Sequence, residues 1–236
     1  MPHKNTGTPG SHSRESRASR IVVLISGSGS NLQALMEAAA GQRLGGGEIV
    51  AVISNRPDAG GLKRAAGVGI PGHSLNHRDY PDRPGFDRAL STLIDGYRPD
   101  LVVLAGFMRI LTDDFVNHYQ GRLINIHPSL LPAYPGLHTH RRALEAGDRE
   151  HGATVHFVTA QLDGGPAIVQ GRVPVLRDDT PERLAARVLT QEHRIYPAAV
   201  RWFCQGRLQL GDNGVLLDGA PLAHPVDAGD DNGPLP

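Results

Sequence analysis

Four runs of apolar, often β-branched residues recur through the first half of the chain, at 21–25, 49–53, 101–104 and 123–126. Continuous runs of this kind are typical of strands buried on both faces of a parallel sheet. Between them the apolar residues take the spacing of amphipathic helices. The expected helices are 32–40, 62–66, 86–97 and 113–119. Alternating strands and helices predict an α/β fold, a doubly wound, mostly parallel sheet with right-handed crossovers.

The pattern changes after Pro132, where elements of other kinds follow one another. A Pro at the first helical position and an Asn-Gly pair are start and turn signals. We expect a helix at 139–146, strands at 154–158 and 168–175, a long C-terminal helix at 181–205 and a short hairpin at 208–217.

The two ends of the chain differ from the middle in composition. Residues 1–20 are rich in Ser, Gly, Arg and His, with four basic residues and one acidic residue. Residues 211–236 hold five aspartates and no Lys or Arg. We therefore expect a disordered basic extension at 1–20, one domain at 21–218 and a flexible acidic tail at 219–236.

Composition argues against several classes of protein. The formal net charge is +0 and no long basic face is apparent, which argues against nucleic-acid binding. No apolar run approaches the roughly 20 residues of a membrane helix. Cys204 is the only cysteine and lies beside aromatic residues, so we interpret it as a buried, inert thiol. A single cysteine fits a reducing, cytoplasmic compartment.

Asn125 and His127 are the most informative pair in the chain. They lie two positions apart at the end of an apolar run, and alternate residues of a strand point to the same face. Pro128 ends that strand. The pair is therefore expected at the carboxyl end of the sheet, where open α/β sheets place their ligands. An amide and an imidazole on one face can act on a single substrate atom.

The segment Ser26-Gly27-Ser28-Gly29-Ser30-Asn31 joins the first expected strand to the first expected helix. Glycines permit close approach, and free N–H groups at a helix start attract an anion. The pattern is neither G-x-G-x-x-G nor a P-loop, so a phosphate monoester fits better than a dinucleotide or a triphosphate. The competing interpretation is a tight turn in which Ser30 or Asn31 caps the helix.

Three charged residues are weaker candidates. Asp163 lies in a Gly-rich turn, where an aspartate usually bonds its own backbone. Glu192 can be a solvated helix charge. Arg109 follows a buried strand, so it lies either at the ligand edge or in a surface salt bridge.

Histidines do not predict a metal centre. A catalytic zinc needs three protein ligands, and no carboxylate or cysteine stands at typical spacing from His138 and His140. We interpret both as structural and expect no metal. His156 lies within an expected strand and is interpreted as a packed or supporting residue.

Taken together, these motifs resemble the folate-dependent formyltransferase family, in particular its glycinamide ribonucleotide branch. The resemblance runs from about residue 21 to residue 217. The segments that carry it are Ile-Ser-Gly-x-Gly-Ser-Asn at 25–31, Leu-Ala-Gly-Phe-Met-Arg-Ile-Leu at 104–111, Asn-Ile-His-Pro-Ser-Leu-Leu-Pro at 125–132, His-Gly-Ala-Thr-Val-His-Phe-Val at 151–158 and Gln-Glu-His at 191–193.

The resemblance implies a Rossmann-like fold of the formyltransferase type and 10-formyltetrahydrofolate as co-substrate. It implies formyl transfer to a primary amine in purine synthesis, small-molecule partners and a monomer or homodimer. The implied catalytic residues are Asn125, His127 and Asp163. The implied substrate phosphate and ribose contacts are Gly29, Ser30, Asn31, Leu189, Thr190, Gln191 and Glu192. The implied folate contacts are Arg83, Met108, Arg109, Ile110, Leu111, Asn125, Thr159, Ala160, Gln161, Leu162 and Asp163.

One departure and two alternatives accompany this interpretation. Relatives often carry acidic residues where this chain has Ala160 and Gln161, which matters only if a side chain contacts the pterin. A formyltetrahydrofolate hydrolase of the same family would release formate to water. A non-catalytic sensor would bind a phosphorylated ligand and need neither Asn125 nor His127.

Overall fold

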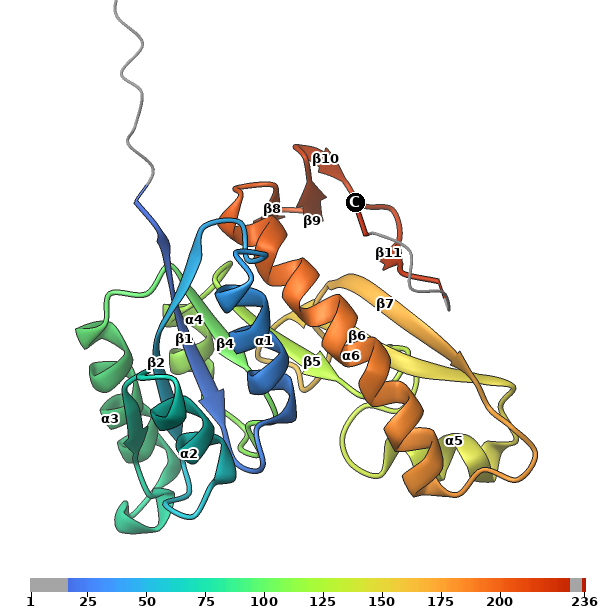
Figure 1. The fold of residues 1–236 in the computed structure, drawn as a ribbon, viewed down its shortest axis with the longest axis horizontal. Helices are drawn as coiled ribbons and strands as arrows, with labels where there is room; N and C mark the ends of the chain where they lie inside the picture. Colours follow the sequence, from blue (N-terminus) through green and yellow to red (C-terminus); the bar gives the residue numbers. More distant parts are fainter. Residues whose placement is uncertain (1–16, 230–234) are drawn as a thin grey trace, which may run out of the picture.

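The computed structural model describes residues 17–229 and 235–236. Its centre is an eight-stranded sheet in the order β11-β7-β6-β5-β4-β1-β2-β3, so the predicted doubly wound sheet is confirmed (Figure 1). The five strands from β5 to β3 run parallel, whereas β6 is antiparallel to both neighbours. The strands are β1 Ser19–Ile25, β2 Gly47–Ser54, β3 Gly72–Ser74, β4 Leu101–Leu104, β5 Leu123–His127, β6 Glu150–Phe157, β7 Ala167–Pro174 and β11 Val226–Asp227.

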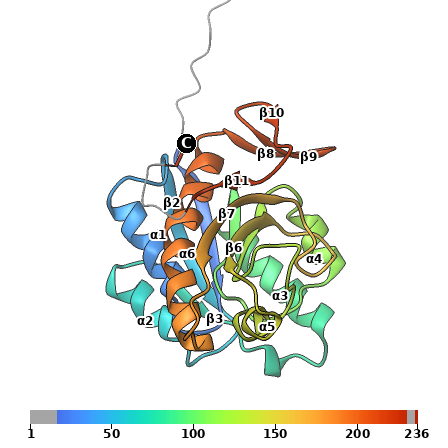
Figure 2. The same ribbon diagram turned by 90° about the vertical axis from the view of Figure 1, so that its right-hand side faces the viewer.

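Helices cover both faces of this sheet (Figure 2). They are α1 Ser30–Ala40, α2 Gly60–Gly67, α3 Arg83–Gly96, α4 Asp113–His118, α5 Thr139–Ala146 and α6 Pro181–Cys204, with a short 3-10 turn at His77–Asp79. Helices α1 and α6 pack with one face of the sheet, and α3 and α4 pack with the other. Val22 and Leu24 of β1 join the second cluster, whereas Val23 and Ile25 join the first. This explains the unbroken apolar run, because both faces of β1 are buried.

The C-terminal hairpin is also confirmed. Strands β8 Leu208–Gly211 and β9 Gly214–Leu217 pair antiparallel, and β10 Ala220–Pro221 adds a third strand. No helix in the described part of the chain is both long enough and apolar enough to cross a membrane.

The structure differs from the expectation for the two ends. Strand β1 already begins at Ser19, and Arg17 forms an ion pair with Asp100, whose carboxylate also accepts the Arg20 N–H. Beyond 218, β10 and β11 are strands, because backbone groups pair there with β9 and β7. The remaining expected extension, 1–16, and part of the expected tail, 230–234, lie outside the described residues. The domain limits at 20 and 218 stay predictions.

The parallel strands β1, β4 and β5 all end at one edge of the sheet. The loops after Ile25, Leu104 and His127 therefore begin side by side. These loops carry the Gly-Ser segment, the Met108–Leu111 segment and the residues that follow Pro128.

Candidate active site

Asn125 and His127 project from the same side of β5. Asn125 lies opposite His156 of β6, and His127 lies opposite Thr154. Directly opposite residues of an antiparallel pair share a face. One amide and two imidazoles therefore gather at the end of β5, where Pro128 stops the strand.

Asp163 approaches this group from the loop between β6 and β7. Its Oδ2 lies 3.4 Å from Nδ1 of His127, and its Oδ1 lies 3.9 Å from Nε2 of His156. The Gly136 N–H donates to the same Oδ2 at 2.8 Å, which fixes the carboxylate. Asp163 is thus nearly buried, with a side chain 8% exposed, and does not simply bond its own turn.

Both ring nitrogens of His127 face protein atoms. Nε2 lies 2.8 Å from the carbonyl oxygen of Tyr134, to which it can only donate. Nδ1 faces Asp163 at 3.4 Å, a separation that is long for a hydrogen bond. A substrate oxygen can therefore reach an N–H of His127 only on the Asp163 side.

His156 belongs to the same cluster, although the sequence interpretation gave it only a supporting place. Its Nδ1 lies 2.9 Å from the carbonyl oxygen of Phe157, and its Nε2 lies 3.2 Å from the Asn125 amide nitrogen. Burial lowers the pKa of His156, so the ring is neutral, with Nδ1 donating and Nε2 accepting. One of the two Asn125 amide hydrogens is then used, and the other is left for a ligand. The position of His156 opposite Asn125 on the neighbouring strand is the signal that could have placed it in the site.

The loop after β5 connects these groups. Tyr134 has a positive φ of 55°, and its carbonyl oxygen accepts from His127 and from the Ser129 hydroxyl. Its own hydroxyl donates to Asp148 at 2.7 Å. Gly136 of the same loop binds Asp163. The segment thus holds the imidazole and the carboxylate together, a role that sequence reasoning missed.

The Gly-Ser segment forms an uncapped helix start. Gly29 is the N-cap of α1, is left-handed with φ 75°, and provides no side-chain cap, so neither Ser30 nor Asn31 caps the helix. A Cβ at Gly29 would come within 2.8 Å of the Gly61 Cα, which only glycine avoids. First-turn N–H groups without a cap attract an anion. A hollow of about 450 Å³ opens here, lined by residues 26–31, Asn55, Arg56, His77, Ala105, Gly106, Met108 and Arg109.

Glu192 is buried and is not a solvated helix charge. Its Oε2 accepts from the Asn31 amide at 2.6 Å, which ties α6 to the start of α1. Burial raises the pKa of Glu192, and the bond from Asn31 opposes that shift. The carboxylate therefore lies beside the expected phosphate site.

The neighbouring residues of α6 do not all face this site. Gln191 is buried against Gly171, and Leu189 is half-buried. Thr190 is exposed, donates its hydroxyl to the Arg187 carbonyl and lines a different groove between α1 and α6. The structure therefore separates Thr190 from Glu192.

The expected folate segments are exposed near the same edge. Met108 and Ile110 are large exposed apolar residues, and Leu162 in the Asp163 loop is another. Arg109 stacks over the Phe86 ring at 5.1 Å and forms no ion pair among the described residues. The Met108 N–H donates to the Ser26 hydroxyl at 2.7 Å, which joins this segment to the Gly-Ser segment.

The remaining expected contacts are placed as follows. Leu111 and Thr159 are half-buried, and Ala160 and Gln161 are exposed. Gly165 closes that loop, and a Cβ there would overlap the Phe157 carbonyl oxygen. Arg83 is exposed in the first turn of α3.

Within residues 17–229 and 235–236, no group of three or more His, Cys, Asp or Glu side chains is placed to hold a metal ion. The expectation that the protein uses no metal stays a prediction. Cys204 is half-buried, and burial raises the pKa of its thiol to about 11. A protonated thiol is a poor nucleophile.

Comparisons with known proteins agree with this geometry. Residues 19–200 match the family model described as formyl transferase. Phosphoribosylglycinamide formyltransferase of Escherichia coli is 57% identical over 202 residues, which cover 86% of this chain and 95% of that protein. The human trifunctional purine biosynthetic protein adenosine-3 is 44% identical over 213 residues, 90% of this chain but 21% of that protein.

Solved structures give the same result. The phosphoribosylglycinamide formyltransferase of Coxiella burnetii is 54% identical, with a TM-score of 0.84 over 89% of this chain and 100% of that one. A formyltetrahydrofolate deformylase from Pseudomonas putida is 30% identical, with a TM-score of 0.77 over 87% of this chain and 72% of that one. The chain therefore belongs to the formyl transferase family of enzymes.

Proposed function

We propose that this enzyme transfers the formyl group of 10-formyltetrahydrofolate to the primary amine of glycinamide ribonucleotide, a step of de novo purine biosynthesis. The relatives from Escherichia coli and Coxiella burnetii carry the name of that activity, and they cover most of this chain. The single observation that carries the proposal is the meeting of Asn125, His127 and Asp163 at the sheet edge that also holds the uncapped start of α1.

The first chemical task is to stabilise negative charge on oxygen. Attack of the amine on the formyl carbon produces a tetrahedral oxyanion, and donors aimed at that oxygen beforehand lower the barrier. Asn125 has one amide hydrogen that His156 does not take. His127 supplies the second donor through Nδ1, whose contact with Asp163 is long enough to be shared.

The second task is to move a proton from the attacking amine to the departing folate nitrogen. Asp163 is held by Gly136 with its Oδ2 facing His127. We assign it the relay of the proton through a water. The amine is the nucleophile itself, so no covalent enzyme intermediate is needed.

Binding of the phosphorylated acceptor is assigned to α1 and α6. The substrate phosphate would lie at the first-turn N–H groups of α1, next to Gly29, Ser30 and Asn31. Glu192, bonded to Asn31, would face the ribose and glycinamide end. Leu189 and Gln191 precede Glu192 on α6 and would lie beside this end of the substrate. Thr190 lines the groove between α1 and α6 instead.

Binding of the folate is assigned to the exposed apolar segments. Backbone groups of Met108, Arg109, Ile110 and Leu111 would hold the pterin, and residues 159–163 would cover it. The apolar side chains of Met108, Ile110 and Leu162 are exposed and can be buried by a flat ring. Arg83 would contact the glutamyl portion. Ala160 and Gln161 can replace the acidic residues of relatives without loss of folate binding if backbone groups hold the pterin ring.

The test follows the absorbance of the folate product on mixing enzyme, formyl donor and glycinamide ribonucleotide. We expect product only when the amine is present. Formate release without the amine would identify a hydrolase instead. Binding of a phosphorylated ligand with no turnover, unchanged by Asn125→Ala and His127→Ala, would identify a sensor. We also propose that the enzyme is cytoplasmic and acts as a monomer or homodimer. Its partners would be small molecules, and it would use no metal, nucleic acid or membrane.

A further inference from the structure

The segment from Met108 to Leu111, assigned above to the pterin, has open backbone groups. Within the described part of the chain, the N–H and C=O groups of Arg109, Ile110 and Leu111 bond no other protein group. The side chains of Met108 and Ile110 are also exposed. A loop with so few internal bonds is normally mobile. A flat ring that bonds such groups binds well only if they are held in place beforehand.

Ser26 holds the first end of this segment. It follows β1 directly and is buried. Its hydroxyl oxygen accepts the Met108 N–H at 2.7 Å, and its own N–H donates to the Gly106 carbonyl oxygen at 3.1 Å. The chain from Gly106 to Met108 is therefore tied twice to one residue at the end of β1.

Asn55 orients the Ser26 hydroxyl. Asn55 is buried at the end of β2, and its Oδ1 accepts from the Ser26 hydroxyl at 2.5 Å. A hydroxyl has one hydrogen, so this bond leaves the lone pairs of the Ser26 oxygen for the Met108 N–H. The amide nitrogen of Asn55 lies 3.2 Å from Nδ1 of His77. Two buried side chains from adjacent strands thus build the acceptor for Met108.

Asp87 of α3 holds the second end. Its Oδ2 accepts the Thr112 N–H at 2.6 Å, and Thr112 in turn is the N-cap of α4. The other carboxylate oxygen, Oδ1, is buried and bonds no group among the described residues. Burying a carboxylate for a single hydrogen bond is costly. Apolar residues alone could pack α3 against α4, so the contact with Thr112 calls for another explanation.

We propose that Ser26 and Asp87 are positioning residues for the folate. They fix the N–H groups of Met108 and Thr112, and the open backbone groups between these two points are thereby held ready for the pterin ring. Each acts through the backbone and not by contact with the ring. This role rests on the proposed function and deepens it, because it assigns part of the folate affinity to buried residues behind the binding segment.

The experiment compares three variants. Ser26→Ala removes the acceptor for Met108, Asp87→Ala removes the acceptor for Thr112, and Asp87→Asn keeps an acceptor without the charge. Isothermal titration calorimetry measures the Kd for tetrahydrofolate, the folate product. We expect this Kd and the KM for the formyl donor to rise about five- to twentyfold in both Ala variants, and less than about twofold in Asp87→Asn. The kcat and the KM for the amine should change by less than about threefold, because ground-state and transition-state binding of the folate weaken equally.

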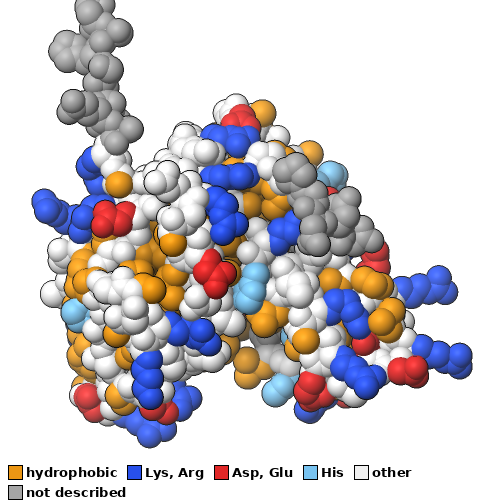
Figure 3. Space-filling view, viewed as in Figure 1, with side chains coloured by type: hydrophobic (Ala, Val, Ile, Leu, Met, Phe, Trp, Pro, Cys, Tyr) orange, Lys and Arg blue, Asp and Glu red, His pale blue; other side chains and the backbone are white. Residues whose placement is uncertain are grey.

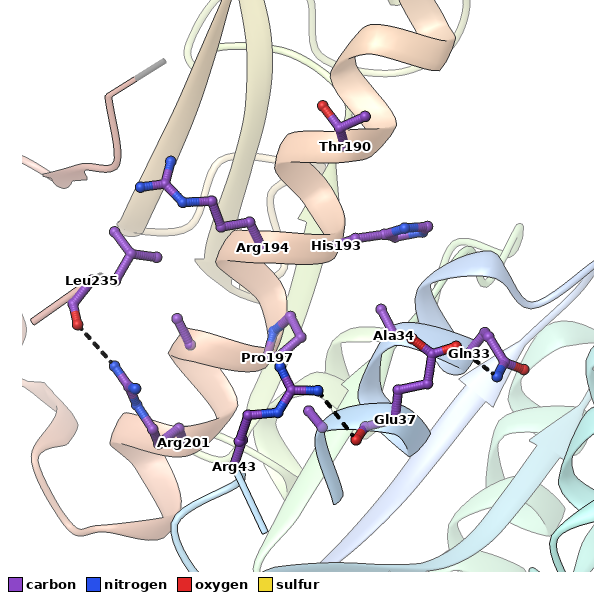
Figure 4. Close-up of a pocket in the computed structure, with 12 residues that line it drawn as sticks. Gln33, Ala34, Glu37, Arg43, Thr190, His193, Arg194, Pro197, Arg201 and Leu235 are labelled. Atoms are coloured by element: carbon purple, nitrogen blue, oxygen red, sulfur yellow. Dashed lines mark hydrogen bonds between the residues drawn. The ribbon is translucent and has the colours of Figure 1, made fainter. Parts of the chain in front are cut away.

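The matched control comes from the groove between α1 and α6. Figure 3 shows Lys and Arg side chains gathered over these helices, and Figure 4 shows the side chains that line the groove. There the Glu37 carboxylate accepts from the Gln33 amide at 3.0 Å, one of the bonds drawn in Figure 4. Glu37→Ala also removes a hydrogen-bond acceptor, but not one that holds the pterin segment. It should leave the tetrahydrofolate Kd and both KM values unchanged.

Hydrogen exchange separates positioning from a general loss of stability. Without ligand, peptides that cover 106–112 should exchange faster in Ser26→Ala and Asp87→Ala, whereas peptides of β1 and β5 should keep their native exchange. A tetrahydrofolate Kd close to native in both Ala variants would overturn the proposal. An equal rise in Asp87→Ala and Asp87→Asn, or faster exchange throughout the sheet, would also overturn it, because charge or stability would then be the cause.

Failure of this role and failure of the proposed function are distinguishable. A native protein that binds no tetrahydrofolate, or transfers no formyl group, refutes the proposed reaction and the positioning role with it. A native protein that binds tetrahydrofolate and turns over, with unchanged folate affinity in both Ala variants, refutes only the positioning role.

Discussion

The Asn31 side-chain amide donates to the Glu192 carboxylate at 2.6 Å, although 161 positions separate the two residues in the sequence. The bond joins the first turn of α1 to the middle of α6 at the expected phosphate site. Its carboxylate is buried and its pKa is raised, so keeping the group ionised at neutral pH costs folding free energy.

Substitution Glu192→Gln should raise stability at neutral pH. A carboxyl whose pKa is raised by folding favours the folded state below its ordinary pKa of 4.5, and that contribution is lost as pH rises through the higher folded value. Gln keeps an acceptor for Asn31 without the buried charge. We expect Tm to rise by a few degrees at pH 7 and the difference to vanish near pH 4. An equal Tm difference at both pH values would contradict this.

The same variant should bind its acceptor less well. If Glu192 faces the ribose and glycinamide end, KM for the amine should rise at pH 7 while KM for the folate stays constant. The matched control is Glu182→Gln, because Glu182 is an exposed residue at the start of α6. It should change neither the KM for the amine nor the KM for the folate.

Asn125→Ala and His127→Ala should each reduce kcat at least about a hundredfold, because each removes one donor to the oxyanion. Circular dichroism should show the native fold. The matched control is His118→Ala, an exposed histidine paired with Asp95 on α3, which should retain full activity. Near-normal turnover of Asn125→Ala or His127→Ala would rule out the role assigned to the residue replaced.

Tyr134→Phe should lower kcat about ten- to a hundredfold with a smaller effect on both KM values. The substitution removes the bond to Asp148 and releases the loop that holds His127 and Asp163. Asp148→Asn keeps an acceptor for the Tyr134 hydroxyl, so its kcat should be close to native. Equal losses in Tyr134→Phe and Asp148→Asn would mean that the hydrogen bond is not the cause.

Gly29→Ala should destabilise the protein by about 1–3 kcal/mol, because its φ of 75° and the nearby Gly61 Cα both exclude a side chain. KM for the phosphorylated amine should rise with it. Gly67→Ala is the comparison, since nothing lies within 4 Å of a Cβ there. That variant should gain about 0.4–1 kcal/mol from its less disordered unfolded state. Urea unfolding measures the change in the free energy of unfolding in both variants.

The central strands were predictable because their residues are buried on both faces, which leaves unbroken apolar runs. Strands β3, β10 and β11 were not predicted, since segments of two or three residues are too short to show a period. Their pairing depends on where neighbouring elements bring the chain. The same holds for the first residues of β1, where Asp100 binds Arg17 and Arg20.

The candidate site, like the fold, was predictable from the sequence only in part. Asn125 and His127 lie two positions apart, so strand geometry alone places them together. The Tyr134 and Gly136 contacts depend on the backbone path of a loop with a positive φ, which residue type does not reveal. Burial of Glu192 depends on the packing of α1 against α6, and nothing in Gln191-Glu192-His193 indicates it.

Strand β11 lies beside β7 at one end of the main sheet, where Val226 pairs with Val169 and Asp227 with Gln170. Without it, the backbone groups of β7 along that stretch would face solvent as an open edge. Open edges recruit strands from other molecules and begin aggregation. A polypeptide shortened to residue 218 would therefore be more prone to precipitate, even with its catalytic cluster complete.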